Sequence, residues 1–173
     1  MQKNIDTPSL DRFKLRLAVI DDIKMYYKWV NDTEVRKQSF NRGQVLLDSH
    51  QKWFQQKLHD ENCLLLVMEM DCIPVGQIRF DFKGGVAHID YSLDKKARGK
   101  NWGKILLNKG IKWAGENKHI TFHADVKQQN PSSAMVFIKQ GFTEMDSDDA
   151  EVRIFEMSST IHTIESMTQR NPK

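Results

Sequence analysis

The residues best suited to chemistry lie in the segment YSLDKKARGKNWGK, between Tyr91 and Lys104. The apolar pattern predicts that a strand ends here and that a helix begins after a basic loop. The first N–H groups of a helix have no partner within it and point outward at the positive end of the helix dipole, so they bind phosphate groups. Gly99 and Gly103 leave room at this turn, and the basic side chains are Arg98, Lys100 and Lys104. The segment predicts a site for a phosphate-bearing ligand, although a solvated basic loop has the same pattern.

The rest of the chain must supply the elements that position this turn. Asp21 stands where an N-cap would start the first helix, and Pro131 and Gly141 mark the two ends of the last one. In the first half of the chain we predict a strand at 13–19, helices at 21–32 and 47–59, and strands at 64–70, 75–82 and 86–93. In the second half we predict a helix at 102–117, a strand at 120–126, a helix at 131–141, and two final strands, the second at 152–157. This order of about seven strands and four helices is typical of an α+β fold.

Length and composition favour one ordinary globular domain. The 173 residues suffice for one core, which we expect to span residues 1–157, and the polar tail at 158–173 has too little apolar content to require structure. The net charge of +3 is spread along the chain, so we expect no binding to nucleic acid. No apolar run is long enough to span a membrane and the polar start is no secretory signal, so we expect a cytoplasmic protein. Cys63 and Cys72 lack the spacing of a metal site, so we expect free thiols and no metal.

The basic turn resembles the signature of the GNAT N-acetyltransferases, which is Arg or Gln, two residues, Gly, one residue, and Gly or Ala. The sequence here runs from Arg98 to Gly103, with Asn101 where the family usually has glycine. Asparagine is the residue next most tolerant of unusual backbone angles. A second motif downstream, ADVKQQNPSSAMVFIKQGF, is similar to the family's strand, asparagine, helix and Gly-Phe ending. Two independent motifs in the proper order make a chance resemblance improbable.

The resemblance implies a mixed, mostly antiparallel sheet that is splayed between the fourth and fifth strands. Acetyl-CoA, the acetyl donor, would enter there with its pantetheine arm. A bulge in the fourth strand would free a backbone N–H for the thioester oxygen, as in an oxyanion hole. The residues implied to bind the cofactor are Tyr91, Ser92, Leu93, Arg98, Gly99, Lys100, Asn101, Trp102, Gly103, Lys104, Asn130, Ser133 and Phe137.

Acetyl transfer also needs a group that takes the amine proton. Asp125 and His88 match strand positions at which members of the family carry a catalytic glutamate, so the resemblance makes them candidate bases. His123 is a third candidate, because it lies two residues before Asp125 and therefore on the same strand face. Ordinary strand residues with hydrogen bonds would look the same. The family's usual proton donor is a tyrosine where this chain has Phe137, so water, Tyr91 or another group would serve instead, or the enzyme is slow.

The segments WVNDTEVRKQSFN and SHQKWFQQKL resemble the GNAT enzymes that acetylate a UDP-linked 4-amino sugar in pseudaminic acid synthesis. The resemblance implies that the acceptor is bound by Trp29, Arg36, Phe40 and His50. Arg36 and His50 would meet a diphosphate, and Trp29 or Phe40 would stack on uracil. The alternative for such aromatic residues is a place in the core.

Three functions remain open at this point. The first is an amino-sugar acetyltransferase, and the second is an acetyltransferase for protein N-termini, polyamines or another small amine. The third is a non-catalytic module that binds acyl-CoA, which the missing tyrosine and glycine both permit. The expected partners are acetyl-CoA and a small amine, and the chain would act as a monomer or a homodimer.

Overall fold

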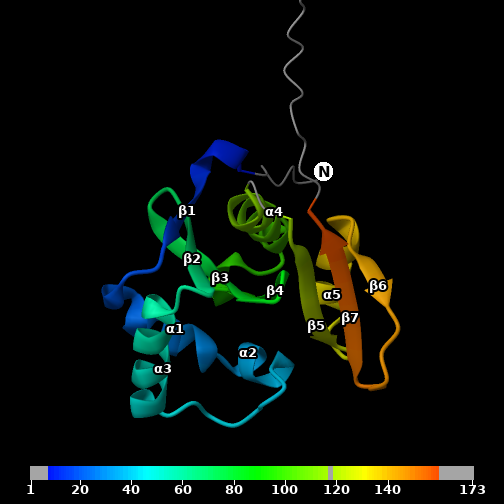
Figure 1. Ribbon diagram of the computed structural model, residues 1–173. Coiled ribbons are helices and arrows are strands. Elements are labelled where there is room, and N and C mark those ends of the chain that lie inside the picture. Colours follow the sequence, from blue (N-terminus) through cyan, green and yellow to red (C-terminus); the bar gives the residue numbers. More distant parts are fainter. Residues whose placement is uncertain (1–7, 117–118, 160–173) are drawn as a thin grey trace, which may run out of the picture.

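The computed structural model describes residues 8–116 and 119–159. One seven-stranded sheet in the order β1-β2-β3-β4-β5-β7-β6 forms the centre of the molecule (Figure 1). Its strands are β1 (Phe13–Leu17), β2 (Cys63–Met70), β3 (Ile73–Lys83), β4 (Val86–Leu93), β5 (Thr121–Lys127), β6 (Thr143–Met145) and β7 (Val152–Ser158). The helices are α1 (Ile23–Val30), α2 (Thr33–Gln38), α3 (Leu47–His59), α4 (Trp102–Gly115) and α5 (Pro131–Lys139). The predicted α+β class and the chain order of the seven strands are confirmed.

The sheet parts between β4 and β5. These strands run parallel and pair only at Val86–Thr121, Ala87–Phe122 and His88–His123, whereas every other neighbouring pair of strands in the described chain is antiparallel. Beyond His88 the two strands diverge, and in Figure 1 an open V lies between them. The splay predicted from the resemblance is therefore present.

Helices cover both faces of the sheet. Leu106 and Leu107 of α4 and Phe137 of α5 pack with Phe80 and Phe122 in the larger core on one face. Helix α4 lies close to β3, since a Cβ on Gly110 would come within 2.9 Å of Ile78. On the other face, α1 and α3 enclose a smaller core against β2, formed by Ala18, Tyr26, Trp29, Phe54, Leu65 and Val67.

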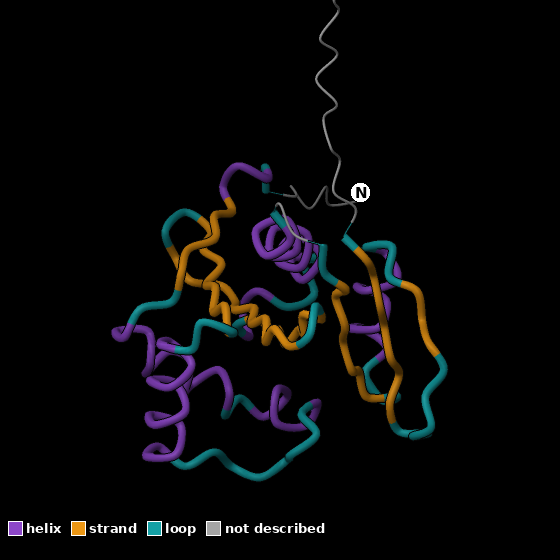
Figure 2. The backbone as a smooth tube through the Cα atoms, in the orientation of Figure 1, coloured by secondary structure: helices purple, strands orange, loops and turns teal. Residues whose placement is uncertain are grey.

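The number of helices differs from the prediction, because the described chain has five α-helices and not four. The additional helix, α2, has only six residues and so gives little periodic signal. Its N-cap is Asp32, whose carboxylate accepts hydrogen bonds from the N–H groups of Glu34 at 3.1 Å and Val35 at 3.3 Å. In Figure 2 the loop from α2 to α3, residues 39–46, runs along the side of the molecule on which the V opens.

The start of α1 also corrects the prediction. Asp21 is exposed and lies in a 3-10 turn, Ile20–Asp22, and α1 begins only at Ile23. The neighbouring carboxylate, Asp22, is the one that anchors the turn, by accepting from the N–H of Val19 at 2.9 Å. At the other end of the chain, the side chain of Asn130 accepts from the N–H of Ser133 and Gly141 has a φ of 87°, so both predicted ends of α5 are confirmed.

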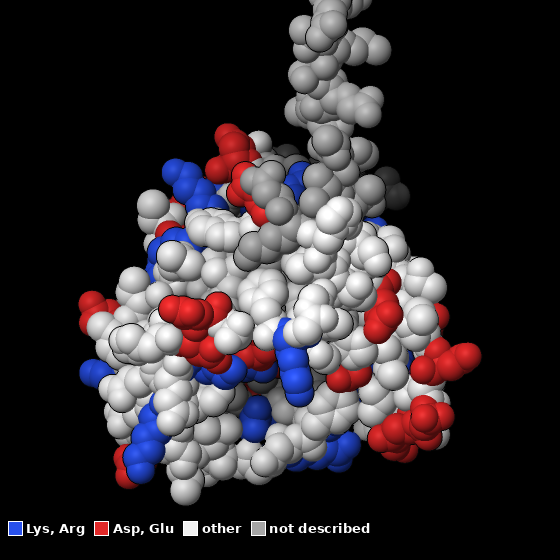
Figure 3. Space-filling view, viewed as in Figure 1, with Lys and Arg blue, Asp and Glu red and all other residues white. Residues whose placement is uncertain are grey.

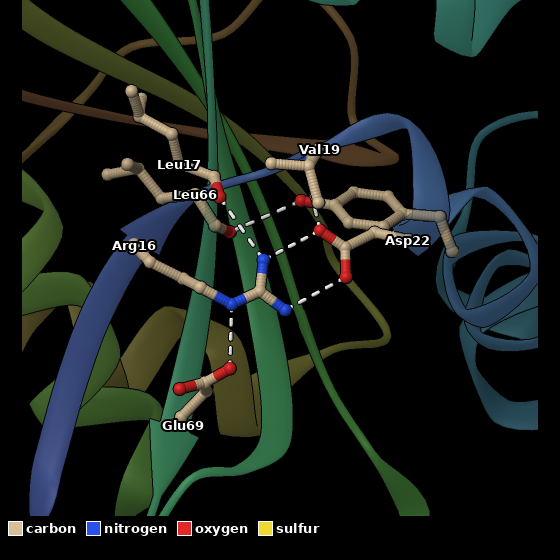
Figure 4. Close-up of polar contacts among 7 residues, drawn as sticks. Arg16, Leu17, Val19, Asp22, Leu66 and Glu69 are labelled. Carbon is tan, nitrogen blue, oxygen red and sulfur yellow. Dashed lines mark hydrogen bonds and ion pairs between the residues drawn. The ribbon is translucent and has the colours of Figure 1, made fainter.

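Arg16 of β1 joins three segments of the chain (Figure 4). Its guanidinium donates to both carboxylate oxygens of Asp22, at 2.6 and 2.8 Å, and to Glu69 of β2 at 2.6 Å. Burial raises the pKa of Asp22, but the hydrogen bonds from Arg16 and from the N–H of Val19 outweigh it and hold this pKa below its usual range. The charge pair fixes the turn before α1 to the edge of the sheet.

Both cysteines are free, as predicted, and burial raises the pKa of the Cys63 thiol to about 12. Strand β7 extends to Ser158, so the predicted tail at 158–173 begins inside a strand, and its residues 160–173 lie outside the described residues. Within the described segments, no helix combines the length and the apolar character that crossing a bilayer requires.

Candidate active site

A cavity of about 1850 Å³ occupies the opening between β4 and β5. Its walls come from all five α-helices of the described chain and from strands β3, β4 and β5. In the space-filling view, Lys and Arg side chains lie in and beside a hollow on this face (Figure 3). All thirteen residues predicted to bind the cofactor line the cavity, as do the four predicted to bind the acceptor and Asp125. His88, the other predicted base, is not among the lining residues.

The basic turn has the backbone that a tight approach to a phosphate requires. Gly99 has a φ of 74° and Asn101 a φ of 61°, both in the left-handed region. Asn101 is the N-cap of α4, so the residue that replaces the family's glycine stands where asparagine is tolerated. The indole Nε1 of Trp102, on the first turn of α4, is buried and finds no hydrogen-bond partner in the described parts of the chain. Together with the N–H groups of Trp102 and Gly103 at the start of α4, it makes this turn a source of hydrogen-bond donors at one wall of the cavity.

The three basic side chains of the turn have different surroundings. The Arg98 guanidinium lies 2.8 Å from the carboxylate of Asp32 and donates to the carbonyl of Leu93 at 3.1 Å. Arg98 thus ties the turn to α2 and to the end of β4, which makes it a positioning residue. The ammonium of Lys100 lies 4.8 Å from the ring centroid of Trp102, and Lys104 is exposed. Lys100 and Lys104 are the two that remain available to a phosphate.

The end of β4 exposes its backbone without the predicted bulge. Tyr91, Ser92 and Leu93 pair with Ile78, Gln77 and Gly76 of β3 in continuous register, and no shift interrupts the described β3–β4 ladder. On the other edge the parting of β5 leaves these residues without a strand partner in the described sheet. The predicted bulge is therefore wrong, and the splay itself frees backbone N–H groups of β4 toward the cavity.

Tyr91 and Phe137 meet on the wall beside the turn. Their ring centroids are 5.8 Å apart, and the Tyr91 hydroxyl lies 3.1 Å from the hydroxyl of Ser133. Phe137 is 2% exposed and packs against Phe142 and Phe155, so it belongs to the core as well as to the cavity lining. Burial raises the pKa of Tyr91 to about 12. Tyr91 therefore brings a protonated hydroxyl to the site where the family's tyrosine is missing.

The predicted bases form one group on the face of β5. Asp125 lines the cavity with its side chain 45% exposed, and its Oδ1 lies 3.1 Å from Nε2 of His123. The other ring nitrogen of His123 lies 2.9 Å from a carboxylate oxygen of Glu156. The ring of His88 is 4.7 Å from that of His123, centroid to centroid. Of the candidate bases, only Asp125 has direct access to the cavity.

The four residues predicted to bind the acceptor separate into two pairs. Trp29 is 4% exposed and donates from Nε1 to Asp94 at 2.9 Å, while His50 is 2% exposed and its Nε2 lies 3.2 Å from the carbonyl of Ile23. Burial lowers the pKa of His50, so a charge that would attract a diphosphate is disfavoured there. Phe40, by contrast, is 58% exposed, and Arg36 stands on α2 at the cavity wall. Trp29 and His50 fit the core alternative, whereas Arg36 and Phe40 remain open to a ligand.

Lys127 is a cavity residue that the sequence analysis missed. Its ammonium donates to the carbonyls of Lys37 and Ser39, and it lies 5.8 Å from the ring centroid of Phe40. Partial burial and the positive charges of Arg42 and Arg36 hold the pKa of Lys127 below its usual range. Lys127 follows Asp125 by two residues on the same strand face, and this period-two spacing was the signal that could have found it.

Fold and site together define an acyltransferase that uses a CoA thioester, with a basic turn at a helix N-terminus beside parted parallel strands. The family model described as acetyltransferase (GNAT) domain matches residues 12–143. The chain belongs to the GNAT family, and it is an acetyl-CoA-dependent N-acetyltransferase with acetyl-CoA as the acetyl donor. A search of curated proteins gave no match.

Solved structures share the fold at low sequence identity. Spermidine N-acetyltransferase from Vibrio cholerae, in complex with CoA and spermine, is 15% identical, with a TM-score of 0.75 over 86% of this chain and 96% of that one. A domain from Methanocaldococcus jannaschii is 16% identical, with a TM-score of 0.74 over 85% and 98% of the two chains. An uncharacterized protein from Bacillus halodurans is 18% identical, with a TM-score of 0.69 over 84% and 83%. At these identities the likeness shows the fold.

Proposed function

We propose that the acceptor is an amine on an anionic carrier, and specifically the amino group of a UDP-linked amino sugar. The observation that carries this proposal is the pair Arg36 and Lys127 on the acceptor side of the cavity. Neither forms an ion pair with a carboxylate among the described residues, and both are held by oxygens of the segment 37–43. Two neighbouring cations, neither of them in contact with a carboxylate, favour an anion such as a diphosphate, although Asp90 acts on Arg36 and Glu151 on Lys127 from a longer distance.

Phe40 supports the same acceptor. Its exposed ring lies beside Lys127, so a uracil base stacked on Phe40 would place its diphosphate near the two cations. The amino sugar would then extend toward Asp125, two residues from Lys127 on β5.

A polyamine is the second candidate. The same cavity is lined by the carboxylates of Glu34, Asp90 and Asp125, and carboxylates attract ammonium groups. The similar Vibrio cholerae structure is that of a spermidine N-acetyltransferase with spermine bound. The cavity is thus lined by cations that favour a UDP-sugar and by carboxylates that favour a polyamine. A direct comparison of the two acceptors tests which of them the enzyme prefers.

In the proposed reaction Asp125 accepts the proton of the attacking amine, directly or through a water. The backbone N–H groups at the end of β4 hold the thioester oxygen while negative charge develops on it. The new N–C bond forms as the C–S bond breaks, and the Tyr91 hydroxyl gives its proton to the departing thiolate. Lys100, Lys104 and the first N–H groups of α4 hold the pyrophosphate of the donor.

The test compares kcat/KM for a UDP-linked 4-amino sugar and for spermidine, with release of the CoA thiol as the readout. We expect the UDP-sugar to be preferred. Lys127→Gln should lower kcat/KM for the UDP-sugar by about 10- to 100-fold, the effect of losing one charge-assisted hydrogen bond, and should change kcat/KM for spermidine much less. Lys37→Gln, an exposed lysine on α2, is the matched control and should change neither.

Each other outcome has a definite meaning. A preference for spermidine that survives Lys127→Gln identifies a polyamine acetyltransferase. No thiol release with either amine, despite binding of acetyl-CoA, overturns both candidates and requires a different acceptor amine.

A further inference from the structure

A second group of polar side chains lies where β4 and β5 are last paired. His88 is the final residue of β4 in the parallel pairing and stands opposite His123, and Asp125 follows two residues later on β5. One potential ligand atom from each of these three residues lies within 4.8 Å of the others. We propose that His88, His123 and Asp125 bind a divalent transition-metal ion, with Zn²⁺ as the preferred ion.

The spacing of the donor atoms fits one shared ion. Zn²⁺ binds histidine nitrogen and carboxylate oxygen at about 2.0 to 2.2 Å in tetrahedral geometry, so two of its ligand atoms lie about 3.4 Å apart. His123 Nε2 and Asp125 Oδ1 are 3.1 Å apart. All three side chains project from strands whose register is fixed by the sheet, so a rotation of the exposed His88 ring is the main adjustment that binding requires.

Glu156 supplies the outer shell that such a site needs. It is the register partner of His123 on β7, and its Oε1 lies 2.9 Å from His123 Nδ1. A carboxylate that accepts the Nδ1 proton leaves the lone pair of Nε2 free for a metal, and this carboxylate–histidine–metal arrangement recurs at zinc sites. The sheet thus holds the His123 ring between Glu156 and Asp125, and a bound ion would take the place of any proton on Nε2.

Two histidines and one carboxylate leave the fourth tetrahedral position open. Asp125 lies on the cavity wall, so a bound ion would stand at the acceptor end of the cavity, and Asp125 would act as the base of the proposed reaction only in the metal-free chain. No sequence motif indicates this site, because His88 and His123 lie 35 positions apart in the chain and only the sheet brings them together.

The experiment uses the full chain after treatment with EDTA, and it needs neither acetyl-CoA nor an acceptor. Titration with ZnCl₂ in a calorimeter should show one ion per chain, and CoCl₂ should give the visible absorption bands of tetrahedral Co²⁺. His123→Gln should abolish the absorption bands, and Glu156→Gln should weaken Zn²⁺ binding by about 10- to 100-fold, the usual effect of losing an outer-shell partner. His59→Gln, an exposed histidine on α3, is the control and should bind as the wild type does.

The proposal is overturned if the wild type gives no heat with ZnCl₂, or if His123→Gln binds as tightly as the wild type. A circular dichroism melt checks that each variant is folded. If His123→Gln fails to fold, His88→Gln tests the same prediction at an exposed position. Acetyl transfer without metal binding would refute this site and leave the proposed function intact.

Discussion

Asn101 shows how far a single residue can be understood from the sequence. The signature places a glycine there, and the structure gives the reason, which is a left-handed backbone at the N-cap of α4. Asparagine adopts that conformation at lower cost than other residues with a side chain, so its presence agrees with the geometry. The roles of Trp29 and His50 were less predictable, because an aromatic residue of a binding site and one of the core have the same sequence pattern.

Asp22 gives a prediction at the residue scale. Asp22→Asn leaves Arg16 without the carboxylate that binds it through two oxygens, although Glu69 remains, and should lower the free energy of unfolding by about 2 kcal/mol at pH 6. The folded pKa of Asp22 lies below its unfolded value of about 3.9, so its contribution is complete above that pH and disappears as the pH falls through the folded pKa. Urea unfolding from pH 6 to pH 2.5 measures both effects.

The matched control is Asp21→Asn. Asp21 is the neighbouring exposed carboxylate, and its replacement should change the free energy of unfolding by no more than about 0.5 kcal/mol. A difference between wild type and Asp22→Asn that stays constant through the acid range would contradict the proposed charge pair.

At the scale of elements, the long periodic segments were predictable and the short ones were not. Strand β4 has its predicted bounds, and α3 does as well, because each has a clear apolar period. Helix α2 was missed since six residues hold less than two turns of pattern. The bulge expected in β4 was wrong, because the resemblance indicated which residues lie at the opening but not how their N–H groups become free.

The packing of α4 on the sheet leads to a prediction about Gly110. Gly110→Ala would place a methyl group 2.9 Å from Ile78 and 3.2 Å from Phe80, both buried side chains. Overpacking costs about 1 to 3 kcal/mol, and the better helix propensity of alanine offsets about 1 kcal/mol of it, so we expect a net loss of about 1 kcal/mol.

Equilibrium unfolding in urea measures this loss. The control is Gly103→Ala on the same helix, where the added Cβ comes no closer than 3.5 Å to Tyr91, so overpacking is absent and stability should be equal to that of the wild type or higher by up to about 1 kcal/mol. Equal stability of the two variants would show that α4 can move away from the sheet without cost.

At the scale of the whole molecule, the cavity combines residues from both halves of the chain, and all thirteen residues that the motifs named for the cofactor line it. The acceptor side was less predictable, because the position of Lys127 beside Arg36 depends on how α2 meets β5. No local pattern contains that information. Contacts between distant segments are set by the tertiary fold, which the motifs indicated only as a class.

Binding of the donor should stabilise the whole chain. Acetyl-CoA at 100 times its dissociation constant adds about 2.7 kcal/mol to the free energy of unfolding, which for a chain of this size raises Tm by roughly 5 to 10 °C. Differential scanning fluorimetry measures the shift. ATP is the control for nonspecific binding of polyphosphate and should give a much smaller shift, whereas equal shifts with both ligands would argue against a pocket fitted to the pantetheine arm.

The three residue pairs that join β4 to β5 also make this junction a natural hinge. Few backbone hydrogen bonds resist a small tilt of β5, β6 and β7 away from the rest of the sheet, so fluctuations should concentrate there. A thioester lying between the diverging strands would form hydrogen bonds with β4 and with β5 and so hold the two strands in one relative position. The donor would then stiffen the enzyme at the place where it reacts, before the amine arrives.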